Sequence, residues 1–193
     1  DLSSKIMRTW LAGAGKTILA STAIDYLGEQ SDALAYAYCR YDDEYTATDL
    51  LLCMVRQVLE DNPENVFPAV EPTFDSHSLK DEALLTKDAA RLLGSVLGKL
   101  PRLRIVLDGL DEIADGEKCA LLEVLTALPI QLLIFSRPLP LFEHMLGSRP
   151  LKLLNIEARN EDVRAFITAT LKGDPALRMI IGTEESTIKE VTT

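Results

Sequence analysis

The segment G-A-G-K-T, residues 13–17, brings together the residue types that hold a phosphate group. Glycines let backbone N–H groups converge on phosphate oxygens, a lysine adds positive charge, and a threonine hydroxyl can ligate Mg²⁺. The segment lies between an apolar run and a helical pattern, which is the setting of a phosphate-binding loop, or Walker A motif. Thr17 is a predicted metal ligand. The predicted nucleotide-binding residues are Gly13, Ala14, Gly15, Lys16, Thr17 and Ile18.

Two readings of this loop stay open. The full pattern G-x-x-x-x-G-K-[ST] has a glycine five residues before Gly15, and this chain has Trp10 there. Either the preceding strand ends early and residues 10–14 form the loop, or residues that relatives contain are missing here. A glycine-rich turn between strand and helix, with a solvated Lys16, is the structural alternative to phosphate binding.

Three carboxylates follow the apolar segment L-R-I-V-L, residues 103–107. Because ligands of parallel α/β sheets bind beyond the carboxyl ends of the strands, Asp108 is predicted to hold Mg²⁺. Asp111 and Glu112 lie one turn further on, where either is placed to act as base or to orient a water that attacks a γ-phosphate. The alternative is an Asp-Gly turn followed by solvated acids. In a Walker B motif such a strand and its acids belong to the nucleotide site.

An arginine follows a second apolar segment in Q-L-L-I-F-S-R-P, residues 131–138. At the tip of a neighbouring strand, Arg137 would sense or neutralise a γ-phosphate, as guanidinium groups do in phosphoryl transfer. The predicted catalytic residues are therefore Asp111, Glu112 and Arg137. The alternative for Arg137 is a surface ion pair with a carboxylate, which is worth less than about 1 kcal/mol.

Short β-rich apolar runs alternate with segments of helical period, which is typical of an α/β fold with a parallel sheet flanked by helices. The predicted strands are residues 6–11, 33–39, 103–107, 131–135 and 151–156. The predicted helices are residues 16–27, 47–59, 85–100 and 118–128, with a further one from Asn160. Gly28 is expected to end the first helix in a left-handed cap. Residues 61–80 hold three prolines and no sustained period, so we expect a surface loop there.

Composition limits the function classes. The net charge of −10, from 20 basic and 30 acidic residues, argues against binding to nucleic acid or to an anionic membrane surface. No apolar run reaches the ~20 residues of a membrane helix and no secretory signal is visible, so a cytoplasmic protein is expected. Three widely spaced cysteines favour buried thiols over disulfides, and two histidines without neighbours at ligand spacing disfavour a zinc site.

The length of 193 residues fits one domain, and we predict a single nucleotide-binding core over residues 1–193. The chain begins at Asp1 without a methionine and ends within a helical pattern. We therefore expect it to be an excerpt of a longer chain.

The motifs resemble those of a known family. The chain is similar to the nucleotide-binding core of NACHT domains, the NTPase modules of STAND-class signalling proteins, and within them to the nephrocystin-like N-terminal type of large fungal receptors. The resemblance rests on G-A-G-K-T-I-L-A-S (13–21), A-Y-A-Y-C-R-Y (35–41), L-L-L-C-M-V-R-Q-V-L (50–59), I-V-L-D-G-L-D-E (105–112), F-S-R-P (135–138) and N-E-D-V-R-A-F-I (160–167).

This resemblance implies a three-layer P-loop NTPase fold of ASCE type with a five-stranded parallel sheet. It implies ATP or GTP and Mg²⁺ as cofactors, and a molecular switch in innate immunity or fungal non-self recognition. It also implies flanking helical, winged-helix and repeat domains as partners, with self-association on activation.

The leading hypothesis is a Mg²⁺-dependent, slowly hydrolysing NTP switch. A second hypothesis, motivated by Trp10, is a degenerate scaffold or oligomerisation module that binds no nucleotide productively. A third, a metabolic kinase with a phosphate loop, would need a lid with basic residues, and the cationic positions are too scattered to suggest one.

Overall fold

The computed structural model describes residues 5–10, 15–30, 33–78, 83–138 and 151–156, together with Glu161, Ala165, Thr168 and Gly173. It divides the chain into two compact units, Asp1–Asn155 and Ile156–Thr193. The single nucleotide-binding core predicted over residues 1–193 stays a prediction. The helix predicted from Asn160 falls, apart from those four positions, outside the described residues. The elements that position the candidate site all belong to the first unit.

Five strands form one sheet in the order β2-β3-β4-β1-β5. They are β1 (Lys5–Trp10), β2 (Leu34–Tyr38), β3 (Arg104–Asp108), β4 (Gln131–Ser136) and β5 (Leu151–Ile156). The pairs β2 with β3, β3 with β4, and β4 with β1 are all parallel. Each predicted strand is confirmed to within one residue at either end. Apolar runs in the sequence predicted these strands correctly because strands of a parallel sheet are buried on both faces.

The register aligns the strand ends that carry the chemistry. Asp108, the last residue of β3, lies opposite Tyr38 on β2 and opposite Phe135 on β4. Ser136 at the end of β4 lies opposite Thr9 on β1. The carboxyl ends of these four strands therefore meet at one edge of the sheet.

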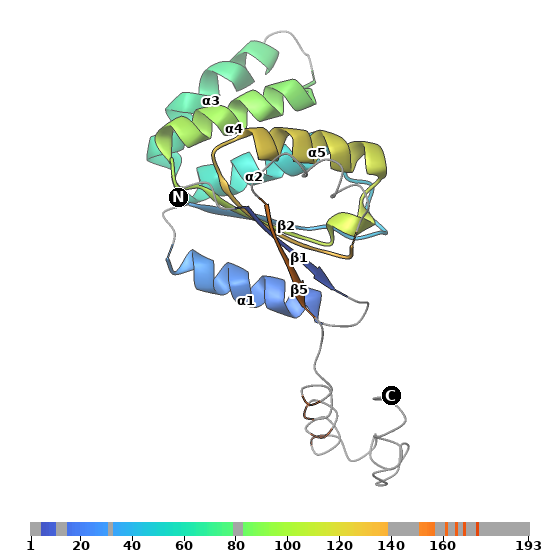
Figure 1. Ribbon diagram of the computed structural model, residues 1–193. Coiled ribbons are helices and arrows are strands. Elements are labelled where there is room, and N and C mark those ends of the chain that lie inside the picture. The colour runs from blue at the N-terminus through green and yellow to red at the C-terminus, as the bar shows by residue number, and fades with distance from the viewer. Residues whose placement is uncertain are drawn as a thin grey trace. The chain divides into compact units, whose positions relative to one another are not determined.

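Helices cover both faces of the sheet (Figure 1). Helix α1 (Lys16–Gly28) lies on one face, and α2 (Ala47–Asp61), α4 (Thr86–Lys99) and α5 (Asp115–Ala127) lie on the other. Helix α3 (Pro63–Ser78) packs against α4 and α2. The four predicted helices are confirmed with small shifts at their ends. None of the helices in the described stretches is long and apolar enough to cross a membrane.

The core lies between the sheet and the layer of α2, α4 and α5. Its largest fully buried side chains include Leu51, Met54, Leu92, Leu93, Ile105, Leu107 and Leu121. A capping box begins α2: the Asp49 amide donates to Thr46 Oγ1 and the Thr46 amide donates to Asp49 Oδ2, both at 3.1 Å. The Ala47 amide also donates to Glu117 Oε2 at 2.6 Å, which ties the start of α2 to α5.

Gln57 of α2 closes the outer edge of the sheet at β2. The Tyr36 amide donates to Gln57 Oε1 at 2.9 Å, and Gln57 Nε2 donates to the Tyr36 carbonyl at 2.8 Å. A side-chain amide thus takes both hydrogen bonds that a neighbouring strand would make at this residue.

The end of α1 differs from the prediction. Gly28 is the last residue of α1 and does not have a positive φ, and Glu29 after it is right-handed with φ of −68°, so the left-handed cap expected at Gly28 is wrong. The amides of Glu29 and Gln30 instead bond back to the Asp25 and Leu27 carbonyls.

The surface loop expected over residues 61–80 is also wrong, because residues 63–78 form α3. Pro63 stands at the first helical position, where its missing N–H costs nothing. Pro68 and Pro72 lie inside the helix but on its exposed side. Val66 and Val70, four residues apart, are fully buried, so packing outweighs the two backbone hydrogen bonds that these prolines remove.

Replacing Val66 with alanine should therefore lower the free energy of unfolding by about 1.5 kcal/mol, since two buried methyl groups are lost. Exposed Glu71 on the same helix is the matched control, and Glu71→Ala should change stability by less than about 0.5 kcal/mol. Urea unfolding followed by circular dichroism measures both. Equal effects would show that α3 does not pack as described.

Candidate functional site

Backbone hydrogen bonds join three strand ends where β3 stops. The Cys39 amide donates to the Asp108 carbonyl at 2.8 Å, and the Gly109 amide donates to the Phe135 carbonyl at 2.9 Å. Gly109 has φ of +76° and begins the short 3₁₀ helix η1 (Leu110–Glu112). A Cβ at Gly109 would clash with the Cys39 carbonyl oxygen, so only glycine fits this turn.

Asp108 is a buried carboxylate with an unpaired oxygen. It is 5% exposed, and its Oδ1 has no hydrogen-bond partner among the described residues. Burial raises the pKa of this carboxyl, while a hydrogen bond from the Thr17 side chain and the charge of Lys16 lower it in part. Asp111 and Glu112 raise it further. The two predicted metal ligands, Thr17 and Asp108, are therefore near enough for the Thr17 side chain to affect the pKa of the carboxyl.

Asp111 gathers the other polar groups of the site. Lys16 Nζ lies 3.2 Å from Oδ1 and 3.4 Å from Oδ2 of its carboxylate. Ser136 Oγ donates to Oδ1 at 3.1 Å, and the Arg137 amide donates to the same oxygen at 3.0 Å. Arg137 Nε lies 3.4 Å from Oδ2. These contacts connect the start of α1 with η1 and the end of β4.

The pKa of Asp111 responds to this network. Burial alone would raise it, but the Arg137 amide and the charge of Lys16 outweigh burial and hold the pKa below its usual range. Asp108 and Asp111 are three residues apart and are shifted in opposite directions. The same short turn therefore holds one carboxylate that resists ionisation and one that favours it.

Two further contacts fix the acidic turn. Glu112 Oε2 accepts a hydrogen bond from the Tyr41 amide at 3.1 Å, which anchors this side chain to the segment after β2. Lys118 of α5 is only 3% exposed, and its ammonium lies 3.0 Å from Asp115 Oδ1 and 3.5 Å from the Asp111 carbonyl.

Burial and the charges of the acids, Asp108 first, raise the pKa of Cys39 to about 12, as expected for an unreactive thiol.

The structure places the other predicted residues as follows. Gly15 precedes α1 with φ of +75° in the left-handed region, and a Cβ there would meet no atom within 4 Å. Ile18 lies in the first turn of α1, and the residue is 70% exposed. Gly13 and Ala14 lie outside the described residues, as does the course of the backbone between Trp10 and Gly15.

Sequence reasoning assigned no role to Ser136, Tyr41 or Lys118. Ser136 ends an apolar strand, and only its position beside Asp111 distinguishes it from a core serine. Tyr41 contributes only its backbone amide, which almost any residue could supply, so the amino-acid sequence gives no signal for this role. A buried Lys118 carries a weak signal, because it is the one cation in the apolar stretch of α5.

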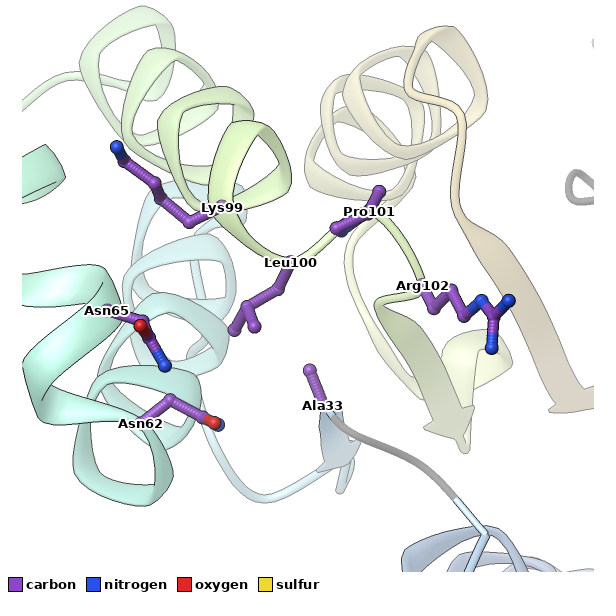
Figure 2. A pocket seen from close by; sticks show the side chains of 7 residues that line it. All are labelled: Ala33, Asn62, Asn65, Lys99, Leu100, Pro101 and Arg102. Atoms are coloured by element: carbon purple, nitrogen blue, oxygen red, sulfur yellow. The ribbon is translucent and has the colours of Figure 1, made fainter.

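A separate pocket of about 340 Å³ lies at the opposite edge of the sheet (Figure 2). It is bordered by Ala33 before β2, Arg102 before β3, and the ends of α2 and α4 at Asn62 and Lys99. None of the predicted site residues lines it. The candidate site is therefore defined by its side-chain contacts.

The residues at the site fit a magnesium ion that is shared with a nucleotide. Mg²⁺ is usually held by one or two protein oxygens, several waters and phosphate oxygens. Asp108, with its unpaired oxygen, and the Thr17 hydroxyl supply such a pair. Within the described stretches, no group of three or more His, Cys, Asp or Glu side chains is arranged to hold a metal by itself.

Comparison with solved structures shows an α/β P-loop NTPase-like fold. The ORC2 protein of Aeropyrum pernix, solved as ADPNP–ADP complexes, is 17% identical with a TM-score of 0.51, covering 88% of this chain and 46% of that one. Cdc6p of Pyrobaculum aerophilum is 14% identical with a TM-score of 0.56, covering 89% and 44%. A Walker-type ATPase of Pyrococcus abyssi is 12% identical with a TM-score of 0.52, covering 98% and 57%. The chain thus spans about half the length of these proteins.

The family can be stated more closely. The sequence pattern described as "Nephrocystin 3, N-terminal" matches residues 4–137. The chain belongs to this family of NACHT-type domains, as its motifs led us to expect. Among curated protein sequences, none matches the chain.

Two glycines with the same backbone conformation should respond differently to a methyl group. Gly15→Ala meets open space and should lower stability by about 1 kcal/mol, the penalty of a left-handed alanine. Gly109→Ala adds a clash with the Cys39 carbonyl and should lower stability by at least about 2 kcal/mol. Urea denaturation of both variants measures the difference, and equal losses would contradict the close approach at Gly109.

The two shifted carboxylates should give opposite pH effects on stability. Asp108→Asn should raise the free energy of unfolding by about 1 kcal/mol at pH 7, because a neutral amide is less costly to bury than an unpaired carboxylate. The pKa of Asp108 is raised in the folded protein, so the wild type recovers this loss as pH falls through that pKa.

For Asp111 the sign reverses. Its folded pKa is lowered, so its contribution to stability is present above the unfolded pKa of about 3.9 and is lost as pH falls through the folded value. Asp111→Asn should therefore be destabilising at pH 7, and the loss should shrink as pH falls below the unfolded pKa. Urea unfolding of both variants between pH 7 and pH 3 tests the pair. A destabilised Asp108→Asn at pH 7 would show that its carboxylate is compensated.

Proposed function

We propose that the chain is the nucleotide-binding core of a molecular switch, with Mg²⁺ and ATP or GTP as cofactors. The observation that carries the proposal is the buried Oδ1 of Asp108, which has no partner among the described residues, at a carboxyl whose pKa is affected by the nearby Thr17 side chain and Lys16 ammonium. A carboxylate, a hydroxyl and an ammonium at the carboxyl edge of a parallel sheet suit a metal-bound polyphosphate. The strand order β2-β3-β4-β1-β5 supports an ASCE-type arrangement.

Each residue has a proposed role. The backbone from Gly13 to Ile18 surrounds the phosphates, and Lys16 binds their terminal oxygens. Thr17 and Asp108 hold Mg²⁺, which when bound neutralises phosphate charge. Arg137, at the end of β4 with its side chain 55% exposed and its Nε beside Asp111, is the proposed sensor of the γ-phosphate.

Glu112 is better suited than Asp111 to act on water. Both oxygens of Asp111 are engaged by Lys16, Ser136 and Arg137. Glu112 is held through one oxygen by the Tyr41 amide and stays partly exposed. We assign Glu112 as the residue that orients or deprotonates water, with Asp111 as a positioning residue. A single weakly held base fits slow hydrolysis.

The proposed biological role is a STAND-type signalling switch in the cytoplasm, such as one for innate immunity or non-self recognition in fungi. Membership of the NACHT-type family supports this assignment. Helical, winged-helix and repeat domains of a longer chain, and self-association on activation, are the partners proposed on the same ground.

One observation favours the scaffold alternative. Strand β1 extends through Trp10, which leaves only residues 11–14 before Gly15 to surround a phosphate. If this length prevents binding, the domain keeps its fold and acts as an oligomerisation module without nucleotide.

Thermal unfolding and calorimetry with ATP and GTP in Mg²⁺ separate the two functions. Binding at 100 times the Kd should stabilise the chain by about 2.7 kcal/mol, and Lys16→Met should weaken affinity at least about tenfold. Lys87→Met, an exposed lysine on α4, is the matched control and should bind as the wild type does. No stabilisation of the wild type by either nucleotide would leave the scaffold function in its place.

A further inference from the structure

We propose that Asp111 is an internal competitor for phosphate, which holds Lys16 until a polyphosphate takes the lysine over. This inference rests on the proposed nucleotide site and concerns how that site is regulated. It makes the Lys16–Asp111 ion pair an autoinhibitory contact between α1 and η1.

The pair is shielded from water. The side chains of Lys16 and Asp111 are 12% and 5% exposed, and the ammonium lies within 3.4 Å of both carboxylate oxygens. Attraction between charges at this depth is stronger than in a surface ion pair. A phosphate that recruits Lys16 must therefore replace an interaction already present, which lowers the apparent affinity for any anion too weakly charged to compete.

Asp111 can release Lys16 without being left unpaired. Ser136 Oγ and the Arg137 amide stay on Oδ1, and Arg137 Nε stays beside Oδ2. Removing a partner from a buried charge is costly mainly when nothing else compensates it. These three donors make exchange of the lysine feasible within a folded site.

The exchange also affects Arg137 at the end of β4. When Lys16 moves to phosphate, Arg137 is the remaining cation on the Asp111 carboxylate among the described residues. The carboxylate then attracts the arginine more strongly, because its charge is no longer shared with the lysine. Binding of phosphate by Lys16 thus changes the electrostatic environment of Arg137 through the Asp111 carboxylate.

Asp111→Asn tests the competition directly. Asparagine has nearly the same shape and still accepts hydrogen bonds from Ser136 and the Arg137 amide, but it lacks the charge that holds Lys16. The probe is inorganic tripolyphosphate, titrated calorimetrically into the 193-residue chain with EDTA present, so that no metal-dependent role of Asp111 contributes. Glu123→Gln, an exposed acid on α5, is the control for the change in net charge.

We expect Asp111→Asn to bind tripolyphosphate about tenfold more tightly than the wild type, and Glu123→Gln to bind as the wild type does. If the wild type binds and Asp111→Asn binds no more tightly, the competition is overturned while the proposed function stands. If neither binds tripolyphosphate or Mg²⁺-ATP, the proposed function fails and the exchange with it.

A second measurement needs no change at Asp111 and so remains decisive if that variant does not fold. In the absence of any phosphate, Lys16→Met should raise the unfolding equilibrium constant about tenfold relative to Lys87→Met, because it removes the more buried of the two cations beside the Asp111 carboxylate. Equal unfolding constants for the two variants would overturn the ion pair on which the proposal depends.

Discussion

Two carboxylates buried at the end of one strand determine the organisation of this domain. Water cannot solvate them fully, so the protein must supply compensating donors or leave a charge exposed to its apolar surroundings. Asp111 receives an ammonium, a hydroxyl, an amide and a guanidinium, while Asp108 keeps one oxygen without a partner. The uneven division of donors assigns a structural task to one carboxylate and leaves the other available to a ligand.

This division depends on the sheet. Because parallel strands end at the same edge, β3 and β4 deliver Asp108 and Ser136 next to each other, and α1 starts close enough for Lys16 to reach across. Gly109 allows β3 to turn sharply against the Cys39 carbonyl, so η1 folds back over the strand ends. The site is therefore a product of backbone pairing first and of side-chain chemistry second.

Much of this arrangement was predictable from the sequence, because apolar runs and helical periods are local signals. The strands, four helices and the acids after β3 all follow from such patterns. Helix α3 was missed because Pro68 and Pro72 are local evidence against a helix, whereas the burial of Val66 and Val70 depends on α4. Likewise, Lys16 and Asp111 are 95 residues apart, and no local pattern shows that they pair.

The role of Ser136 was hidden for a similar reason. A serine at the end of an apolar strand is common, and it becomes informative only when the register brings it to Asp111. Sequence patterns thus located the acids and the lysine separately. Which of these groups form ion pairs and hydrogen bonds with one another could be seen only in the three-dimensional arrangement.

The amide of Gln57 has a consequence for how such domains can assemble. It occupies the N–H and the carbonyl of Tyr36, in the middle of the strand that ends the sheet on this side. Another chain that sought to lengthen the sheet here would first have to break both bonds. Extension of the sheet by a second chain is therefore disfavoured at β2, because the edge of the sheet is already paired there by a side chain of the same domain.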